Sequence, residues 1–504
     1  MPSDERLLRA QQQQVAGAIL AARLYRETYP QVRPTLVNTG DSLAGAAMLM
    51  RHKMPKELVT AFGDEALGQT VPPEMHTAYN AWALRELSRK MGYGDVPVDA
   101  CYEWKGRNIR DFGERHAAAW RQRDALIAHA WHYRLVPVTG LIEPGNSYHN
   151  TVWGDDWMFS RSPQNYPRMS FVTTAHLTQV LDGAQCARRL DTGSLTVYGL
   201  EFTRGQGRVY AFWTVRGTAE LTVTFTGEAA VRQTDMFGRA QARRTNGNAL
   251  ALAISGEPIY LETTGQVAAV TVGRRAYPDD AVPAGATVQV AEAMEAADRW
   301  QMSDKPDDRL QNEPKLDNRS YLPYRVLGAY ALREVADAEK GACLELELLP
   351  EGDVVPFLPE YTVLKLKQPA PIAGEPHTVG VWVNGNSGWG QVMWEFTDAE
   401  GESWLSCGTG GYWCDVYDWP KQASINFDGW NFVQFPITQA SPVRLPNPGE
   451  VSEQWRSGGG NGRIDYPIAL TGLSVNMTRQ ALNLTEMQPV KTVIRLKDLS
   501  AYGN

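Results

Sequence analysis

Two glutamates that follow short apolar segments could carry nucleophilic or acid–base chemistry. Glu103 ends the segment "VPVDACYEW" between Tyr102 and Trp104, and Glu65 lies in "AFGDEALG". Glycoside hydrolysis needs two carboxyl groups, about 5 Å apart for retention of configuration and about 6.5–9.5 Å apart for inversion. Aromatic neighbours favour a sugar substrate, because flat rings stack on the C–H faces of sugars. The alternative is a carboxylate that pairs with a nearby arginine such as Arg107.

Glu65 could act together with Glu103 if the two segments form neighbouring strands. Adjacent strands lie about 4.8 Å apart, and two close carboxylates push one pKa upward, which separates an acid from a nucleophile. The alternative is that Asp64 and Glu65 hold substrate hydroxyls or orient neighbouring residues. We predict Glu103 and Glu65 as the catalytic candidates.

The segments that would position these residues alternate between strand and helix periodicity over residues 1–185. Four short apolar strands are each followed by a helix, which is the pattern of a parallel sheet covered by helices; the strands are "PTLVNTG", "ELVTAFGDEALG", "VPVDACYEW" and "RLVPVTGLIEPGNS". Polar residues gather after the strands, where a (β/α)8 barrel places its chemistry. We therefore expect half of such a barrel, with strands five to eight. A doubly wound sheet is the alternative, although no G-x-G-x-x-G follows any strand.

The long segment "EPGNSYHNTVWGDDWMFSRSPQNYP" follows the last of these strands. Loops of this length inside a compact domain are functional or disordered, and the aromatic residues argue against disorder. The alternative is packing against the following domain. We predict that this loop and the strand ends bind substrate, through Asn38, Tyr102, Trp104, His149 and Trp153.

From about residue 186 the hydrophobic period changes to two, which predicts antiparallel strands. We expect a small antiparallel β-sandwich over residues 186–276, a linker over 277–323 and a jelly-roll-like β-sandwich over 324–504. Eight of the 16 Trp lie between Trp382 and Trp455. Those in or beside predicted loops, Trp389, Trp413 and Trp419, are predicted to form an accessory carbohydrate-binding surface. The alternative is a structural accessory domain without a ligand.

The composition limits the partners and cofactors. A net charge of −8 argues against nucleic acid and anionic membrane surfaces, and no apolar segment is long enough to span a bilayer. The five Cys lack metal-ligand spacing, so we predict no metal and no cofactor. Cys407 and Cys414 either pair across a hairpin or remain free thiols. The compartment stays open, with a secreted or periplasmic location favoured if a signal segment precedes this chain.

The combination of these segments resembles the clan A glycoside hydrolases. The resemblance covers roughly residues 1–275 and rests on "FGDEALG", "CYEW", "YHNTVWGDDWMFSRSPQNYPRMSFVTTAHLTQVLDGA", "VYGLEFTRGQGRVYAFWTVRG" and "EPIYLETTG". It implies a (β/α)8 barrel followed by a small β-sandwich, and a retaining hydrolase of polysaccharides or oligosaccharides. It also implies that Glu103, at the end of strand seven, is the nucleophile. Residues 277–504 resemble the accessory β-sandwiches of polysaccharide-degrading enzymes.

The sequence departs from this family at the acid/base residue. In the family that residue is a Glu after an Asn at the end of strand four, and no Asn-Glu pair occurs in the barrel region of this chain. The first half-barrel lies on another chain or an upstream segment, or the chain is catalytically incomplete, or Glu65 replaces the acid. Open strand edges would favour self-association or a missing partner. The competing hypothesis is a non-catalytic carbohydrate-binding or scaffold protein.

Overall fold

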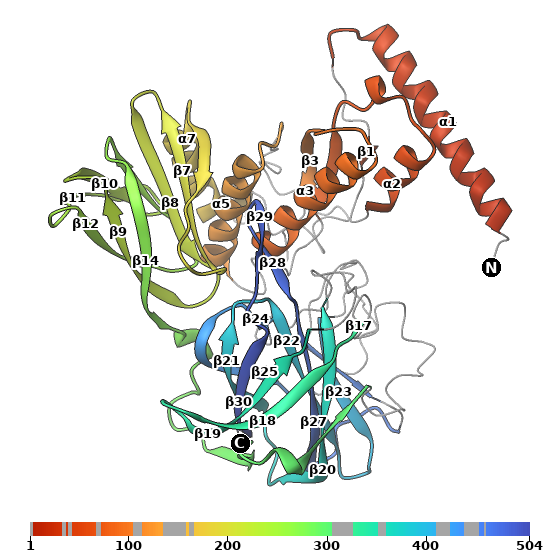
Figure 1. Ribbon diagram of the computed structural model, residues 1–504, viewed down its shortest axis with the longest axis vertical. Coiled ribbons are helices and arrows are strands. Elements are labelled where there is room, and N and C mark those ends of the chain that lie inside the picture. Colours follow the sequence, from red (N-terminus) through yellow and green to blue (C-terminus); the bar gives the residue numbers. More distant parts are fainter. Residues whose placement is uncertain are drawn as a thin grey trace. The chain divides into compact units, whose positions relative to one another are not determined.

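The computed structural model describes most of the chain, in segments 4–32, 37–38, 43–66, 72–103, 113–134, 158–160, 166–304, 326–350, 359–409, 424–437, 453–457 and 460–503. The chain divides into two compact units. The first comprises Met1–Arg189, Leu200–Val209 and Thr234–Arg239, and the second comprises the remaining segments. Within the described residues, every α-helix lies in the first unit and the second unit is built from strands, so the protein combines an α/β region with all-β regions (Figure 1).

The first unit contains a three-stranded parallel sheet with the order β1-β2-β3. Its strands are β1 (Val37–Asn38), β2 (Phe62–Ala66) and β3 (Val98–Glu103). Phe62 and Val98 are register partners at the start of β2 and β3, and both side chains are fully buried. Apolar residues at the strand starts therefore fix the sheet, while polar residues follow at the carboxyl ends.

Helices connect and cover these strands, as their 3.6-residue periodicity predicts. They are α1 (Asp4–Thr28), α2 (Leu43–Arg51), α3 (Pro73–Lys90), α5 (Glu114–Ala130) and α7 (Met169–Leu181). Pro73 occupies the first turn of α3, where a missing N–H costs nothing. Gly92 follows the end of α3 with a φ of +78°, a conformation that glycine adopts without strain.

The fourth predicted strand, "RLVPVTGLIEPGNS", lies outside the described residues except for its first residue, Arg134. The Arg134 backbone N–H donates to the Val98 carbonyl at 3.0 Å. The chain therefore returns beside the start of β3 after α5. Closure of the sheet into a half-barrel remains a prediction.

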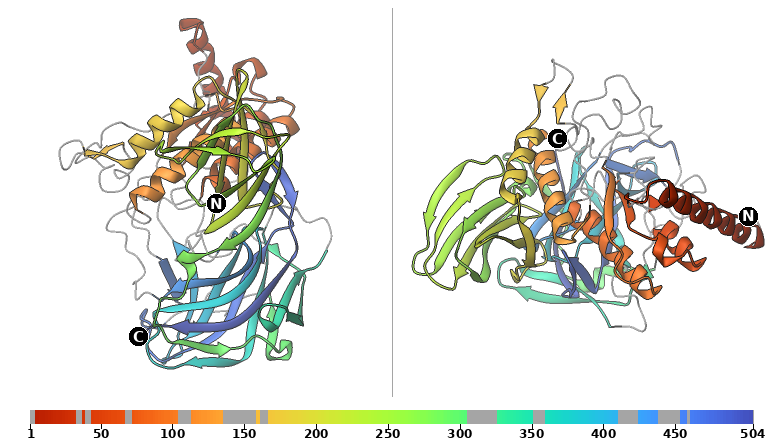
Figure 2. Two further views of the ribbon diagram at one scale, coloured as in Figure 1. Left: turned by 90° about the vertical axis from the view of Figure 1, so that its left-hand side faces the viewer. Right: turned by 90° about the horizontal axis from the view of Figure 1, so that it is seen from above.

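The small β-sandwich predicted after residue 186 consists of two sheets (Figures 1 and 2). One sheet has the order β11-β10-β13-β8-β7-β6, formed by β6 (Gln185–Arg189), β7 (Val197–Arg204), β8 (Gly207–Thr214), β10 (Ala230–Thr234), β11 (Ala240–Arg244) and β13 (Ile259–Thr263). The other has the order β12-β9-β14, formed by β9 (Thr218–Phe225), β12 (Ala249–Ile254) and β14 (Val267–Ala276). Alternate residues such as Leu221, Val223 and Phe225 face the shared core.

The C-terminal sandwich also has two sheets around one core. Sheet E has the order β18-β19-β30-β21-β25, with β15 paired to β30; its strands are β15 (Val288–Glu292), β18 (Tyr330–Asp337), β19 (Gly341–Leu348), β21 (Thr378–Asn386), β25 (Asp428–Pro436) and β30 (Val493–Tyr502). Sheet F has the order β16-β20-β27-β22-β23-β26, with β17 paired to β20 and β24 to β22; its strands are β16 (Trp300–Ser303), β17 (Val326–Leu327), β20 (Glu360–Ile372), β22 (Gly390–Thr397), β23 (Ser403–Thr409), β24 (Ser424–Ile425), β26 (Glu453–Ser457) and β27 (Ile468–Met477). A separate hairpin joins β28 (Gln480–Asn483) to β29 (Glu486–Pro489).

The prediction of a linker over residues 277–323 is wrong for its described part, residues 277–304. Strand β15 pairs with β30, and β16 pairs with β20 through partners such as Trp300 and Leu366. Met294 and Trp300 belong to the core of the C-terminal sandwich. The segment was misread because its Pro, Asp and Ala content suggested a linker, whereas pairing with distant strands gives it a fixed structure.

Candidate active-site edge and a second aromatic surface

The carboxyl ends of β1, β2 and β3 bring the predicted site residues to one edge of the parallel sheet. Glu65 is the register partner of Tyr102, and Ala66 is the partner of Glu103, after a register shift between Asp64 and Glu65. Glu65 and Glu103 therefore lie on neighbouring strands and differ by one position in register. Asn38 ends β1 opposite Gly63. The backbone thus brings these residues of the sequence-derived site to one edge; the side chains of Asn38, Glu65, Tyr102 and Glu103 lie outside the description.

A buried ion pair holds the opposite end of β3. The Asp99 side chain, 1% exposed, accepts hydrogen bonds from Arg134 Nε at 3.0 Å and from Arg134 Nη2 at 2.5 Å. Because Arg134 also bonds Val98 through its backbone, side chain and main chain together fix the chain after α5 against β3. A buried carboxylate is tolerated only with such a partner, so this contact restrains the strand that ends in Glu103.

Helices α3 and α5 are joined by buried polar contacts. Arg123 Nε and Nη2 donate to the two Glu74 carboxylate oxygens at 2.8 and 3.0 Å, and both side chains are 1% exposed. The Thr77 hydroxyl donates to the buried Asp124 carboxylate. Gln122 Nε2 donates to the carbonyl of Thr173 in α7 at 2.7 Å. Sequence reasoning missed this network, because residues about 50 positions apart give no local pattern.

His176, in α7, is a buried residue. Its Nε2 lies 3.2 Å from the Thr234 hydroxyl, and a Cβ on Gly238, which has a φ of +86°, would stand 3.0 Å from His176 Nδ1. Burial, followed by the charge of His132, lowers the pKa of His129.

The remaining predicted substrate residues, Trp104, His149 and Trp153, lie outside the described residues, as do Trp413 and Trp419 of the accessory surface. Their roles stay predictions.

The prediction that Trp389 presents an exposed ring is wrong. Trp389 lies in the connection between β21 and β22, as expected, but its side chain is 3% exposed and its φ is +58°. Its backbone N–H donates to the Ile425 carbonyl at 3.1 Å. Because the connection closes onto β24, the indole is enclosed by the sandwich and offers no face to a sugar.

Other aromatic residues do lie on the face of sheet E that points away from the core. Val381 and Val383 are fully buried in the core, so the intervening Trp382 faces outward, opposite Phe432 at a ring separation of 5.4 Å. The Lys340 ammonium lies 3.4 Å from the Trp382 ring centroid. The half-buried Trp430 donates its indole N–H to Asp337 at 3.0 Å. This outer aromatic surface combines flat rings with hydrogen-bonding groups.

Neither a metal centre nor a membrane span emerges from the part of the chain that the structure describes. In these residues no three His, Cys, Asp or Glu side chains are arranged to hold a metal ion. No described helix is both long and apolar enough to cross a bilayer.

Comparison with solved structures finds carbohydrate-active proteins. A family 39 glycoside hydrolase from Bacteroides cellulosilyticus WH2 is 12% identical, with a TM-score of 0.26, 47% of this chain and 66% of that chain covered. A β-porphyranase of family 86 from Bacteroides plebeius is 9% identical, with a TM-score of 0.31 and coverage of 91% and 66%. A family 11 carbohydrate-binding module from Clostridium thermocellum is 11% identical, with a TM-score of 0.23 and coverage of 44% and 97%.

No family model matches the sequence, and no curated protein matches it. The chain spans less than two thirds of the family 39 enzyme and 63% of a glucosidase from Croceicoccus marinus. These TM-scores are too low to assign a fold or an activity from the likeness alone.

Proposed function

We propose that this chain forms part of a retaining glycoside hydrolase that acts on a polysaccharide or oligosaccharide, with Glu103 as the nucleophile. The observation that carries the proposal is the sheet edge, where Glu65, the last residue but one of β2, and Glu103, the last residue of β3, lie on neighbouring parallel strands. Two carboxyl groups at strand carboxyl ends supply the chemistry that glycosidic cleavage requires. Asn38, Tyr102, Trp104, His149 and Trp153 are proposed to contact the sugar.

In the proposed reaction, the Glu103 carboxylate attacks the anomeric carbon as the glycosidic C–O bond breaks. A second carboxylic acid protonates the departing oxygen and then removes a proton from the water that hydrolyses the glycosyl–Glu103 ester. Glu65 is one candidate for this acid, because it lies on the neighbouring strand. A carboxyl group from a further barrel segment is the other.

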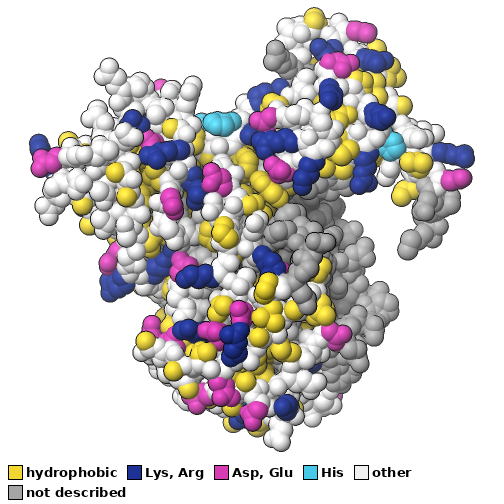
Figure 3. Space-filling view, viewed as in Figure 1, with side chains coloured by type: hydrophobic (Ala, Val, Ile, Leu, Met, Phe, Trp, Pro, Cys, Tyr) yellow, Lys and Arg dark blue, Asp and Glu magenta, His cyan; other side chains and the backbone are white. Residues whose placement is uncertain are grey.

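The surface of the first unit supports a larger parent barrel. Its exposed large apolar side chains lie on and just after the first helix and around the last one, at Leu7, Leu8, Leu20, Leu24, Tyr25, Tyr29, Val32, Tyr166, Met169, Phe171 and Val172. Within the described residues, α2, α3 and α5 carry none. Hydrophobic side chains are visible among the charged ones over α1 in Figure 3. Apolar ends are expected of half a barrel that further strands and helices complete.

Covalent trapping tests Glu103 directly. A 2-deoxy-2-fluoro glycoside with a good leaving group slows the second step of a retaining enzyme, so the glycosyl ester accumulates. Peptide mass spectrometry should find the label on Glu103, and Glu103→Gln should lose both label and turnover. The control Glu86→Gln alters a half-buried glutamate of α3 and should behave as the unchanged protein. A label on another residue would exclude Glu103 as nucleophile.

The acid is tested with Glu65→Gln. If Glu65 is the acid, this variant keeps kcat/KM for aryl glycosides whose leaving groups need no proton and loses kcat/KM for those with poor leaving groups, while kcat falls for both because the same group acts as base in the second step. Equal loss of kcat/KM for both substrates assigns Glu65 a different role. In that case, the acid must come from another segment.

A second candidate function, carbohydrate binding without catalysis, is favoured by the outer aromatic surface of sheet E. Trp382 and Trp430 lie outside the core, although other residues of the same two strands are packed in it. Polysaccharide retention in affinity electrophoresis, together with no hydrolysis of any glycoside, would support this function over the first.

A further inference from the structure

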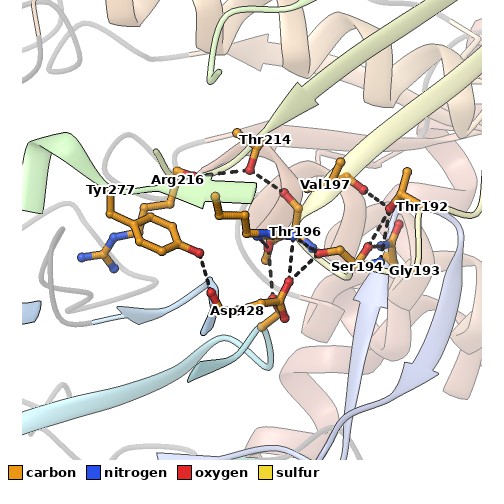
Figure 4. Close-up of polar contacts among 12 residues, drawn as sticks. Thr192, Gly193, Ser194, Thr196, Val197, Thr214, Arg216, Tyr277 and Asp428 are labelled. Atoms are coloured by element: carbon orange, nitrogen blue, oxygen red, sulfur yellow. Dashed lines mark hydrogen bonds and ion pairs between the residues drawn. The ribbon is translucent and has the colours of Figure 1, made fainter. Parts of the chain in front are cut away.

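The two β-sandwiches share a polar interface within the second unit (Figure 4). From the small sandwich, the interface uses the segment around Ser194, the β8–β9 connection at Arg216 and the end of β14 at Arg275. From the C-terminal sandwich, it uses the β21–β22 connection and residues 424–431. Tyr277 and Asp280, in the connection between β14 and β15, complete it. Each side therefore contributes several short connections, rather than a single tether.

Arg216 forms the more buried of two ion pairs at this interface. Its Nε and Nη2 donate to the two Asp280 carboxylate oxygens at 2.7 and 2.8 Å, with the side chains 10% and 6% exposed. Arg216 Nη1 also donates to the Ser424 carbonyl at 2.7 Å. Asp280 accepts a further bond from Asn431 of β25 at 2.8 Å. The guanidinium also lies 5.0 Å from the Phe427 ring centroid, a cation–π contact.

Asp428 is the centre of the second group of contacts. Its carboxylate accepts hydrogen bonds from Ser194 at 2.8 Å and from Ser387 at 2.6 Å, and it pairs with Arg275 Nη2 at 2.7 Å. The Tyr277 hydroxyl donates to its backbone carbonyl at 2.6 Å. Figure 4 shows the contacts of Ser194 and Tyr277 with Asp428.

The β21–β22 connection has a strained backbone at this contact. Ser387 has a φ of +56°, a left-handed conformation that a non-glycine residue adopts at a cost. Its hydroxyl lies 3.1 Å from that of the fully buried Thr196. The β28–β29 hairpin adds a bond from Asn483 to the Ser194 carbonyl at 3.2 Å. Strained and buried polar groups persist only where surrounding contacts determine them.

We infer that these residues form a polar latch that makes the two sandwiches a single unfolding unit and fixes the orientation of the C-terminal sandwich against the small one. The latch consists of the pairs Arg216–Asp280 and Arg275–Asp428 with their hydroxyl partners. Removing one partner of either pair while the interface stays closed would leave a largely buried charge without its counter-charge, which is unfavourable. The C-terminal sandwich is thus a fixed extension of the small sandwich and not a freely moving module.

Hydrogen exchange as a function of urea, measured by mass spectrometry on the whole chain, tests the latch. Peptides from β9, β12 and β14 report on the small sandwich, and peptides from β22, β25 and β27 report on the C-terminal one. In the unchanged protein, the most protected amides of both sandwiches should be exposed at the same urea midpoint. In Arg216→Met/Arg275→Met the two midpoints should separate by about 1 M urea.

The matched control is Arg274→Met. Arg274 neighbours Arg275, is 80% exposed and pairs with Glu220 of the same sandwich at 3.0 Å, so its loss should leave one shared midpoint. If the double variant does not fold, Asp428→Asn keeps the side-chain volume and removes the charge, and its midpoints should separate in the same direction. Two midpoints in the unchanged protein, or coincident midpoints in every folded variant of the latch, would overturn the inference.

Discussion

Glu74, in the first turn of α3, and Arg123, in α5, form a two-pronged ion pair whose side chains are each 1% exposed. The pair joins two helices of the α/β unit that carries the candidate active-site edge. Its two hydrogen bonds satisfy charges that burial would otherwise make costly. It therefore provides the first point at which the stability of this unit can be tested.

Arg123→Met should destabilise the first unit by about 3–5 kcal/mol, because it leaves the Glu74 carboxylate buried without a counter-charge. Arg89→Met is the control, since Arg89 forms a more exposed pair with Glu86 at 2.8 Å and should cost less than about 1 kcal/mol. Urea unfolding followed by the helical circular-dichroism signal measures both. Equal costs would show that the Glu74–Arg123 pair contributes no more than a surface contact.

Asp337 should make the C-terminal sandwich less stable in acid. Although burial alone would raise its pKa, hydrogen bonds from the Glu339 backbone, Arg495, the Lys340 backbone and Trp430 lower it to about 2. Because the folded-state pKa of Asp337 lies below the ordinary carboxyl value, the ionised side chain stabilises the folded protein near pH 4 and above. That stability is lost as the pH falls toward about 2. Asp337→Asn should flatten the decline of the urea midpoint over this pH range. Trp fluorescence during urea unfolding measures the midpoint.

Asp498 serves as a control because its pKa is shifted in the opposite direction to that of Asp337. Burial raises the pKa of Asp498, so its ionisation costs the folded state stability as the pH rises above the ordinary carboxyl value. Asn tolerates the φ of +51° found there. Asp498→Asn should therefore improve stability at neutral pH relative to acid. A steeper fall of the urea midpoint with decreasing pH in Asp337→Asn would contradict the lowered pKa of Asp337.

Trp389→Ala should destabilise the C-terminal sandwich by about 3–5 kcal/mol, because it removes a large buried side chain. The indole is 3% exposed, so polysaccharide retention per folded molecule should not change. Trp382→Ala, on the outer face of sheet E, is the comparison and should cost less stability. Affinity electrophoresis and urea unfolding separate the two effects, and loss of retention without loss of stability at Trp389 would restore it as a binding residue.

Gly472→Ala should weaken the pairing of β27 with β20. An added Cβ would lie 2.6 Å from the Leu364 carbonyl oxygen, which belongs to the backbone and cannot turn away, so we expect a loss of about 1–3 kcal/mol. Gly227→Ala is the control, because nothing lies within 4 Å of its added Cβ. Thermal unfolding of both variants measures the difference, and equal melting temperatures would contradict the steric argument.

The sequence by itself determined the local elements and their classes. Helical periodicity predicted helices between the apolar strands of residues 1–185, and a period of two predicted strands from about residue 186, because burial of one face repeats along the chain with a fixed period. The segments that carry Glu65 and Glu103 pair as neighbouring parallel strands. Their catalytic roles stay proposals.

Only the tertiary structure decided which distant segments meet. The pairing of β15 with β30, the burial of Trp389, the Glu74–Arg123 pair and the latch at Asp428 each join residues that no local pattern relates. Trp389 and the segment 277–304 were misread for this reason, since a tryptophan in a hairpin connection and a Pro-rich stretch look the same whether exposed or enclosed. Whether a residue is buried or paired depends on the distant segment that packs against it, and the tertiary fold determines which segment that is.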